Sequence, residues 1–504
     1  GSGRIYFYVH GGYKGQLDNP ITIEQLPLYP GALVFDGVDD YGVCENFPIL
    51  TKEKGYTVVA LRQWITRGEI AQGLVSNVKN WLKDGAFLLE YRNIQAEHLN
   101  KPISFGAIGS EMDLPHILTY QTSKSYNGVS ITTGNFEGTD VLHVGKLAPT
   151  NVGTCINAAI WELVFLDHDA TEEELTKIKD YFVKTYPWLF PDQAWTVTGK
   201  TNEDEDRATI ANIMGNGNDL VLSNFGFAEG SGYGLYGFKF LSKAGIEYYS
   251  GSKISFSKHQ LDQIALIPYI LIYPGTSYPR EKDITAKIKV AGLKEGVSLT
   301  WGWAGNTELT ITEDGTYSIS AGSGRLRQLE VVYAEGFDPD RVVTIEQIPE
   351  YEGYLVADGV DDEIVSAKSI AFTDTWTIIT DAIFLGEKVV SAGILVKDIF
   401  GVSNLMEYGR VEVSVKGGVL LKVPTPSIKA ICSDGRIYDA DWNEYQAEPG
   451  TIKVSEGKLY IGMWYNGMQF CSIAFKNIAT YNGYALSKDD CIKAYNYLQT
   501  IKAK

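Results

Sequence analysis

Two short runs of the sequence carry three aspartates each at the same spacing. Residues 36–40 and residues 358–362 both read DGVDD. The carboxylates belong to Asp36, Asp39, Asp40, Asp358, Asp361 and Asp362. Clustered carboxylates are the ligands that a hard cation prefers, so both runs are candidate calcium sites. The alternative is structural, because an Asp-Gly pair forms a tight turn and nearby aspartates accept hydrogen bonds from backbone N–H groups.

Both runs end a longer repeat. Residues 22–40 read TIEQLPLYPGALVFDGVDD and residues 344–362 read TIEQIPEYEGYLVADGVDD, a constant offset of 322 with 14 of 19 positions identical. An ungapped repeat of this length predicts a duplicated structural unit. Apolar residues precede each Asp-Gly pair and strand-like alternation resumes after the first one. We therefore expect each run to be a turn between two strands.

Two helix patterns predict where the duplicated units end. Thr171 with Glu174 has the spacing of a capping box, and Ser487 with Asp490 repeats it. The apolar stripe of the first helix comprises Leu175, Ile178, Tyr181 and Phe182. That of the second comprises Cys491, Ala494, Tyr497, Leu498 and Ile501. Each unit should therefore be a strand-rich sandwich closed by one short helix.

The repeat also carries a family resemblance. The run LVFDGVDDYGV resembles the opening strands of laminin-G-like domains, which belong to the concanavalin A-like lectin/glucanase superfamily. The run from TIEQLP through DGVDDYGVCENFPILTKEKGYTVVALRQW is similar to multidomain proteins of gut Bacteroidales and their phages and prophages. The resemblance implies two jelly-roll sandwiches. It implies function only broadly, because such domains include lectins, spacers and hydrolases.

The resemblance directs attention to a third acidic run. Glycoside hydrolases of this superfamily carry Glu-x-Asp-x-x-Glu on one strand, so that two carboxylates flank a glycosidic bond. Residues 439–444, DADWNE, have this spacing in Asp439, Asp441 and Glu444, with Asp in place of the first Glu. Asp and Asn are poor strand formers, and the first unit has no counterpart. We therefore interpret the run as an exposed acidic loop.

Composition limits the remaining classes of function. The formal net charge of −18 argues against a nucleic-acid-binding surface, and no apolar run is long enough to span a membrane. The five cysteines are an odd number without a CxxC pair, which predicts buried free thiols rather than a disulfide scaffold. The sequence contains no HExxH, GxSxG or Walker motif.

Aromatic side chains could stack on sugar rings. The candidates by type are Trp64, Trp81, Tyr91, Trp301 and Trp303. Core packing is the alternative for each, because aromatic residues dominate sandwich interiors.

The sequence predicts a mainly β chain of five parts. Residues 1–25 match residues before the second repeat and should be end strands of a truncated β-sandwich module. Residues 26–190 and 348–504 should be laminin-G-like (concanavalin A-like) jelly-roll sandwiches, each with a C-terminal helix. Between them we expect a small β-rich linker module at 191–263 and an immunoglobulin-like β-sandwich at 264–347, because short strands alternate with turn signals there.

Our leading functional hypothesis is a non-enzymatic modular protein, a structural or adhesive component of a gut bacteriophage or prophage particle that binds surface glycans. The alternatives are a secreted or surface-attached bacterial carbohydrate-binding protein and a glycoside hydrolase using the second unit. The expected partners are surface glycans and other virion or surface proteins, with no nucleic acid, no membrane span and no cofactor other than calcium. The expected location is a virion or the extracellular cell surface.

Overall fold

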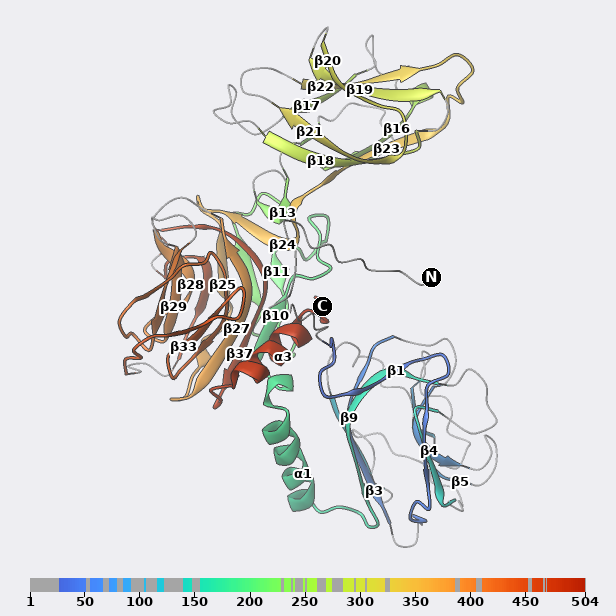
Figure 1. Ribbon diagram of the computed structural model, residues 1–504, viewed down its shortest axis with the longest axis vertical. Helices are drawn as coiled ribbons and strands as arrows, with labels where there is room; N and C mark the ends of the chain where they lie inside the picture. The colour runs from blue at the N-terminus through green and yellow to red at the C-terminus, as the bar shows by residue number, and fades with distance from the viewer. Residues whose placement is uncertain are drawn as a thin grey trace, which may run out of the picture.

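The computed structural model describes most of the chain. The described residues are 27–50, 55–66, 72–78, 85–91, 104–105, 116–121, 139–146, 155–227, 231–236, 239–240, 248–249, 252–260, 269–273, 284–293, 296–303, 306–321, 327–385, 390–404, 410–451, 456–465, 467 and 469–503. The predicted end strands at 1–25 lie outside them. The described chain is mainly β and forms three two-sheet sandwiches (Figure 1). None of its helices is long and apolar enough to cross a membrane.

The first sandwich follows the opening repeat. Its strands are β1 (Leu33–Asp36), β2 (Gly42–Glu45), β3 (Thr57–Trp64), β4 (Gln72–Val78), β5 (Gly85–Tyr91), β6 (Ser104–Phe105), β7 (His116–Gln121), β8 (Val141–Val144) and β9 (Asn157–Leu166). One sheet has the order β1-β9-β3-β7 and the other β2-β8-β4-β5-β6. In β3, Val58 and Ala60 face the core between the sheets, whereas Val59 and Leu61 face outward.

The predicted helix follows as α1 (Glu172–Thr185), with the 3₁₀ helix η1 (Pro187–Leu189) after it. The predicted capping box is present: the Glu174 N–H donates to the Thr171 hydroxyl, and the Thr171 N–H donates to the Glu174 carboxylate. The apolar stripe is narrower than predicted. Leu175 and Phe182 are buried, but Tyr181 is exposed because its hydroxyl reaches out along the surface to Glu162.

The second sandwich begins earlier in the chain than predicted. Its first strands are β10 (Gln193–Thr196), β11 (Thr209–Ile210), β12 (Leu220–Ser223) and β13 (Gly232–Leu235). Strand β10 pairs with β37, β12 with β25, and β13 with β24, all antiparallel. These strands therefore complete the second sandwich instead of forming the linker module expected at 191–263. Their short alternating pattern fits any sheet, and only the pairing identifies which one.

The remaining strands of the second sandwich come after residue 349. They are β24 (Glu350–Asp358), β25 (Glu363–Ser366), β26 (Ile370–Ala371), β27 (Trp376–Phe384), β28 (Val390–Val396), β29 (Phe400–Asn404), β30 (Val411–Val415), β31 (Leu421–Val423), β32 (Ile428–Cys432), β33 (Arg436–Asp439), β34 (Glu444–Gln446), β35 (Glu456–Gly457), β36 (Leu459–Met463) and β37 (Ser472–Asn482). One sheet contains β13-β24-β37-β27-β32-β33-β34, with β10 beside β37, and the other has the order β11-β12-β25-β36-β28-β29-β30-β31. Helix α3 (Lys488–Leu498) closes the unit, capped by Ser487 as predicted.

The middle sandwich is inserted between β13 and β24. Its strands are β14 (Lys239–Phe240), β15 (Tyr248–Tyr249), β16 (Lys253–Ser257), β17 (Tyr269–Tyr273), β18 (Ile284–Ala291), β19 (Val297–Trp303), β20 (Asn306–Ile311), β21 (Gly315–Ala321), β22 (Arg327–Tyr333) and β23 (Val342–Ile348). They form two five-stranded sheets, β14-β17-β22-β19-β20 and β15-β16-β23-β18-β21. The sandwich predicted at 264–347 thus also takes β14 to β16 from the expected linker. Its entry and exit lie side by side, because Leu235 pairs with Glu350.

The two repeat units share one strand order. In the sheet that bears the helix, β1-β9-β3-β7 corresponds to β24-β37-β27-β32. In the opposite sheet, β2-β8-β4-β5 corresponds to β25-β36-β28-β29. The predicted duplication is therefore confirmed at the level of strand order.

A hydrophobic cluster joins the first and second sandwiches. It includes Val59 and Trp161 on the outer face of the first sandwich, Trp188 of η1, and Tyr481 and Tyr497 of the second sandwich. Trp188 makes edge-to-face contacts with Trp161 and with Tyr497, each at a centroid distance of 6.3 Å. The helices and η1 thus form a packed bridge between two sandwiches (Figure 1).

Candidate functional site

The two DGVDD runs are turns, with Gly37 and Gly359 at φ angles of 83° and 78°. In the first, the Asp36 carboxylate accepts from the Val38 N–H at 2.7 Å, and the Asp40 carboxylate accepts from the Asp36 N–H at 3.2 Å. The second turn repeats this arrangement in Asp358 and Asp362, with both distances 2.7 Å. In both copies, two of the three carboxylates therefore stabilise the turn by accepting backbone hydrogen bonds.

The same carboxylates also meet the basic requirement of a calcium site. Oxygen atoms of Asp36, Asp39 and Asp40 lie within 4.8 Å of one another, as do those of Asp358, Asp361 and Asp362. Calcium takes six to eight oxygen ligands, and two carboxylates of each cluster already accept backbone hydrogen bonds. The donor chemistry fits the ion, and calcium binding stays a prediction.

The two clusters differ in burial. Asp40 is exposed, whereas Asp362 is only 1% exposed and also accepts a hydrogen bond from the Ser231 hydroxyl at 3.2 Å. Burial, partly opposed by the hydrogen bond from the Asp358 N–H, raises the pKa of Asp362 to about 7. The folded chain therefore holds a proton at Asp362 over a pH range in which the unfolded chain releases it.

This difference predicts a pH effect on stability. Between pH 4 and pH 7 the folded state binds more protons at Asp362, so its contribution to stability falls as pH rises through that window. We expect Asp362→Asn to remove this fall in stability. In EDTA, the urea midpoint of the variant should therefore rise relative to the wild-type midpoint between pH 4 and pH 7. Asp40→Asn is the matched control and should show a constant difference. An equal pH profile for Asp362→Asn and wild type would contradict the prediction.

Calcium titration at pH 7.5 in the same variants tests the cation. A calcium site at the second turn requires that calcium raise the midpoint of the wild type more than that of Asp362→Asn. An Asp361→Asn variant adds a second readout. Because Asp361 is exposed, loss of its carboxylate should weaken calcium binding without disturbing the turn.

The predicted acidic loop is the turn between β33 and β34. Asp439 is buried rather than exposed, because its carboxylate accepts from the Asp441 N–H, the Asn443 N–H and side chain, and the Tyr445 hydroxyl at 2.8–3.1 Å. Burial alone would raise the pKa of Asp439, but these hydrogen bonds outweigh it and lower the pKa. Asp441 is exposed, as predicted.

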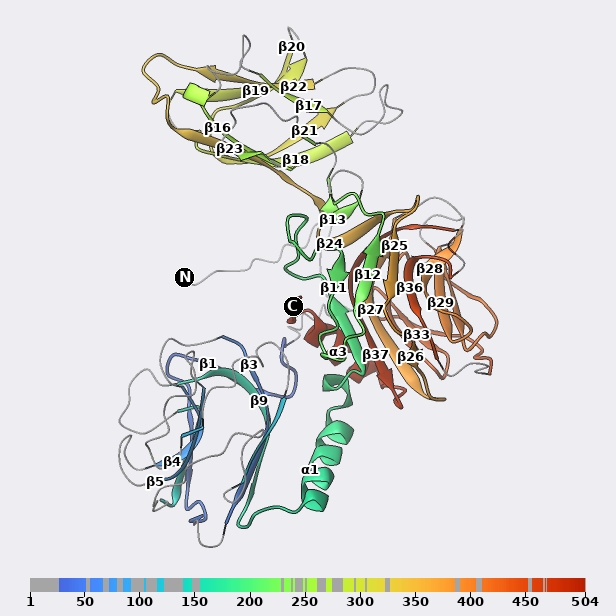
Figure 2. The same cartoon turned by 180° about the vertical axis from the view of Figure 1, so that it is seen from behind.

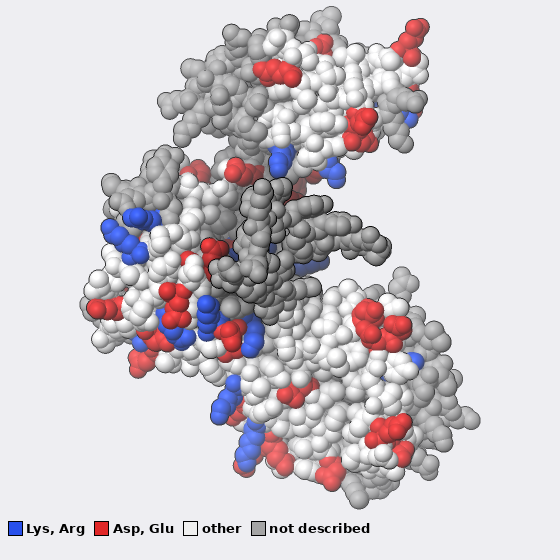
Figure 3. Space-filling model, in the orientation of Figure 1, with Lys and Arg blue, Asp and Glu red and all other residues white. Residues whose placement is uncertain are grey.

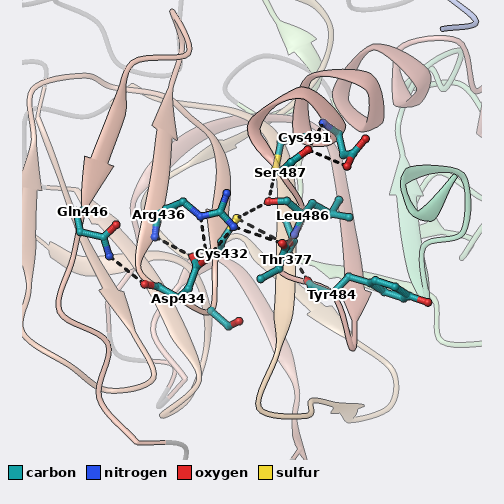
Figure 4. Close-up of polar contacts among 12 residues, drawn as sticks. Thr377, Cys432, Asp434, Arg436, Gln446, Tyr484, Leu486, Ser487 and Cys491 are labelled. Carbon is teal, nitrogen blue, oxygen red and sulfur yellow. Dashed lines mark hydrogen bonds and ion pairs between the residues drawn. The ribbon is translucent and has the colours of Figure 1, made fainter. Parts of the chain in front are cut away.

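Polar contacts anchor this hairpin near helix α3. Arg436 forms an ion pair with Asp434 at 2.7 Å and donates to the Ala485 carbonyl at 3.3 Å. Behind it, the Cys432 and Cys491 thiols both approach the Leu486 carbonyl, at 3.8 and 3.9 Å (Figure 4). All five cysteines are free, as predicted. Four are buried, whereas Cys44 is exposed on β2, which pairs only with β8 among the described strands.

The aromatic candidates divide into core residues and undescribed side chains. Trp64 and Trp301 are buried in the first and middle sandwiches. Trp81 and the side chains of Tyr91 and Trp303 lie outside the described residues.

A pocket of about 240 Å³ lies over β28, β29 and β30 of the second sandwich. Gly401, Ser403, Glu412 and Ser414 line it and alternate with core residues Phe400, Val402, Val411, Val413 and Val415. Because side chains alternate between the faces of a strand, the pocket lies on the outer face of the sheet. The space above Gly401 is open enough that an added Cβ would first meet the Ser414 hydroxyl at 3.4 Å.

Two adjacent aromatic residues form one wall of this pocket. The rings of Trp464 and Tyr465 have centroids 5.0 Å apart at 41°, and the Lys397 ammonium lies 4.8 Å from the Tyr465 ring centroid. Tyr465 is 38% exposed. Apolar ring faces beside hydroxyl and carboxylate groups suit a ligand with both apolar and hydroxyl-bearing faces, such as a sugar.

Sequence reasoning missed these two residues. They directly precede Asn466-Gly467, and the Gly467 N–H donates to the Trp464 carbonyl at 3.0 Å in the turn after β36. A Trp-Tyr pair next to an Asn-Gly turn was the available signal, because residues at a hairpin turn lie at the end of the sheet rather than in the core.

Acidic and basic side chains are distributed unevenly over the visible surface. On the face shown in Figure 3, Asp and Glu side chains form separate patches over the first sandwich, and Lys and Arg side chains gather mainly over the second. Among the described residues, the two groups of three acidic side chains that are close enough to share a metal ion belong to the DGVDD turns.

No family model matches this chain, and no curated protein matches it. Among solved structures, it is similar to a mutant of NanB sialidase from Streptococcus pneumoniae, with 10% identity and a TM-score of 0.21 over 90% of this chain and 99% of that one. A sialidase from Trypanosoma rangeli in complex with sialic acid is similar at 10% identity and a TM-score of 0.15, over 79% of this chain and 51% of that one. The chain thus spans about half the length of the second structure. At these TM-scores the likeness supports no argument about function.

Proposed function

We propose that this chain is a non-enzymatic, modular binding protein that holds a glycan in the Trp464–Tyr465 pocket of its second sandwich. The observation that carries the proposal is the aromatic pair beside Ser403, Glu412 and Ser414 on the outer face of a sheet. Sugars present apolar C–H faces and hydroxyl rims, and this pocket offers a partner for each. The laminin-G-like (concanavalin A-like) assignment of both repeat units belongs to the proposal and is supported by their shared strand order.

The proposed setting is a phage particle, with a bacterial cell surface as the alternative. Its support is the resemblance of the opening repeat to proteins of gut Bacteroidales and their phages, together with a chain of sandwiches suited to an adhesive role. Detection of this protein in purified particles would support the first setting. Recovery of its peptides from protease-treated whole cells would support the second.

The binding prediction concerns Trp464 and Tyr465. We expect Trp464→Ala with Tyr465→Ala to weaken binding to the best glycan of an array by about tenfold or more, because aromatic anchors carry much of the affinity of such sites. The thermal midpoint should change little for Tyr465→Ala alone, since that side chain is partly exposed. Tyr181→Ala removes another exposed tyrosine and is the matched control. Unchanged glycan affinity in the double variant would contradict the proposal.

The hydrolase alternative is tested in the acidic loop. Asp441→Asn with Glu444→Gln should leave glycan binding within about a factor of ten, because surface substitutions away from a site have small effects. Asp439 is kept, since its carboxylate holds the turn together. If the wild type releases reducing sugar from a polysaccharide and this double variant does not, the second sandwich is an enzyme and the binding-only proposal is wrong.

A further inference from the structure

The two repeat units differ at their edges. In the second sandwich, β24 lies between β37 and β13, and β25 lies between β36 and β12. Residues 193–196 of β10 pair with residues 477–480 of β37. Figure 2 shows β11, β12 and β13 lying along this side of the sandwich. Among the described residues of the first sandwich, β1 pairs only with β9 and β2 only with β8. No described residue of the first sandwich occupies the positions equivalent to β10, β12 and β13.

Exposure of equivalent side chains shows the same difference. Leu33 is 62% exposed where Leu355 is fully buried, and Val34 is 44% exposed where Val356 is 2%. On the next strand, Cys44 is exposed where Ser366 is fully buried. Residues 163–165 of β9 are half-buried, whereas the equivalent residues 478–480 of β37, which lie against β10, are buried. Apolar residues on an open strand edge favour pairing with another strand.

The repeated turn contributes polar contacts to the same surface. In the second sandwich, the Asn224 side chain donates to the Asp361 carbonyl at 2.8 Å, and the Ser231 hydroxyl donates to the Asp362 carboxylate at 3.2 Å. Both donors belong to the segment that carries β12 and β13. In the first sandwich, Asp39 and Asp40 of the equivalent turn are exposed.

We propose that the open edges of β1, β2 and β9 form an acceptor site for a separate polypeptide segment with the strand pattern of residues 193–235. The second sandwich shows what that segment must supply. Its inward side chains are Trp195, Leu220, Leu222 and Tyr233, which all belong to the core. Its backbone adds antiparallel strands to both sheets, and its Asn and Ser side chains hold the acidic turn.

The proposed occupant is a partner segment other than residues 193–235 of this chain. Residues 193–235 of this chain are already paired within its own second sandwich, and their withdrawal would expose the core residues Trp195 and Leu220. The acceptor site therefore suits a partner that carries this strand pattern and whose strands are not already paired within a sandwich of their own. Joining such units end to end would build a chain of complemented sandwiches.

Cys44 provides a direct readout on the full chain. It is the exposed cysteine, and its equivalent Ser366 is buried under the added strands. We expect a synthetic peptide of residues 193–235 to bind one per chain and to slow maleimide labelling of Cys44 on the order of tenfold. The same peptide with Leu220→Lys and Leu222→Lys should give no protection, because these side chains enter the core.

Variants of the acceptor test its location. Leu33→Lys with Val43→Lys should abolish binding of the labelled peptide, since lysine on an edge opposes strand addition and both side chains are exposed in the unbound chain. Val38→Lys is the matched control, because Val38 and its equivalent Val360 are both exposed, at 69% and 68%. The Val38→Lys variant should bind the labelled peptide as the wild type does. A second form of the chain, with residues 193–235 joined ahead of residue 27 by a flexible linker, should protect Cys44 without added peptide.

Two results would overturn the proposal. One is unchanged Cys44 labelling both with the peptide and in the linked form. The other is a dimer of the unmodified chain, by light scattering, in which Cys44 is already protected and labels at full rate only on dissociation. That result would assign the acceptor site to a second copy instead.

Discussion

Replacing Trp188 by alanine is expected to lower the free energy of unfolding by about 3–5 kcal/mol, the usual cost of removing a buried tryptophan. Trp188 is 2% exposed and lies between Trp161 of the first sandwich and Tyr497 of α3. Its carbonyl accepts from the Tyr481 hydroxyl at 3.0 Å, a contact that the substitution keeps. The loss should therefore reflect ring packing in the cluster that joins the two sandwiches.

The position of Trp188 predicts an effect beyond stability. We expect Trp188→Ala to increase the radius of gyration in small-angle scattering and to speed proteolysis near residues 186–192, because the two sandwiches become less firmly attached. Trp188→Phe should recover part of both effects. Trp464→Ala is the control, since it removes a half-buried tryptophan from a turn. Wild-type scattering and proteolysis in Trp188→Ala would show that the ring does not hold the sandwiches together.

The second large effect is expected at a buried charge between α3 and its sheet. The side chain of Asp381 is 3% exposed, and its carboxylate lies 3.5 Å from the Lys429 ammonium. It also accepts from the Tyr354 hydroxyl at 3.1 Å and from the Gln499 amide at 3.0 Å. Asp381→Ala should cost about 3–5 kcal/mol, because it leaves Lys429 as a buried charge without its carboxylate.

A double variant separates the effect of the buried charges from the effect of side-chain packing. Asp381→Leu with Lys429→Met should be far closer to wild type than Asp381→Ala, because it removes both buried charges together. Burial already lowers the pKa of Lys429 against the attraction of Asp381. In Asp381→Ala the unfolded chain therefore binds a proton at Lys429 more readily than the folded chain. The loss of stability caused by the substitution should become smaller as pH rises toward about 10.

The control for this series is an exposed ion pair. Lys177 and Glu173 lie 2.7 Å apart on α1 with both side chains more than two-thirds exposed, and Lys177→Ala should leave the urea midpoint unchanged within error. A loss in Asp381→Ala no greater than that of the control, at every pH, would show that the buried pair does not hold α3.

The sequence by itself determined the features that depend on neighbouring residues or on repetition. The constant offset of the two runs predicted a duplication, and the strand orders agree. Thr171 and Ser487 were predicted as N-caps and both accept the expected backbone hydrogen bond. The Asp-Gly turns were predicted in the same way. These features follow from contacts within four residues, which the order of residue types is sufficient to specify.

Only the tertiary structure decided which strands belong together. Residues 191–263 were predicted to form a separate module, yet β10, β12 and β13 pair with strands more than a hundred residues later. Likewise, Ser403, Glu412, Trp464 and Tyr465 meet at one pocket from three separate stretches of chain. The physical reason is that a short alternating strand can pair with any open edge of matching polarity, and its partner is chosen by which edge buries its apolar face.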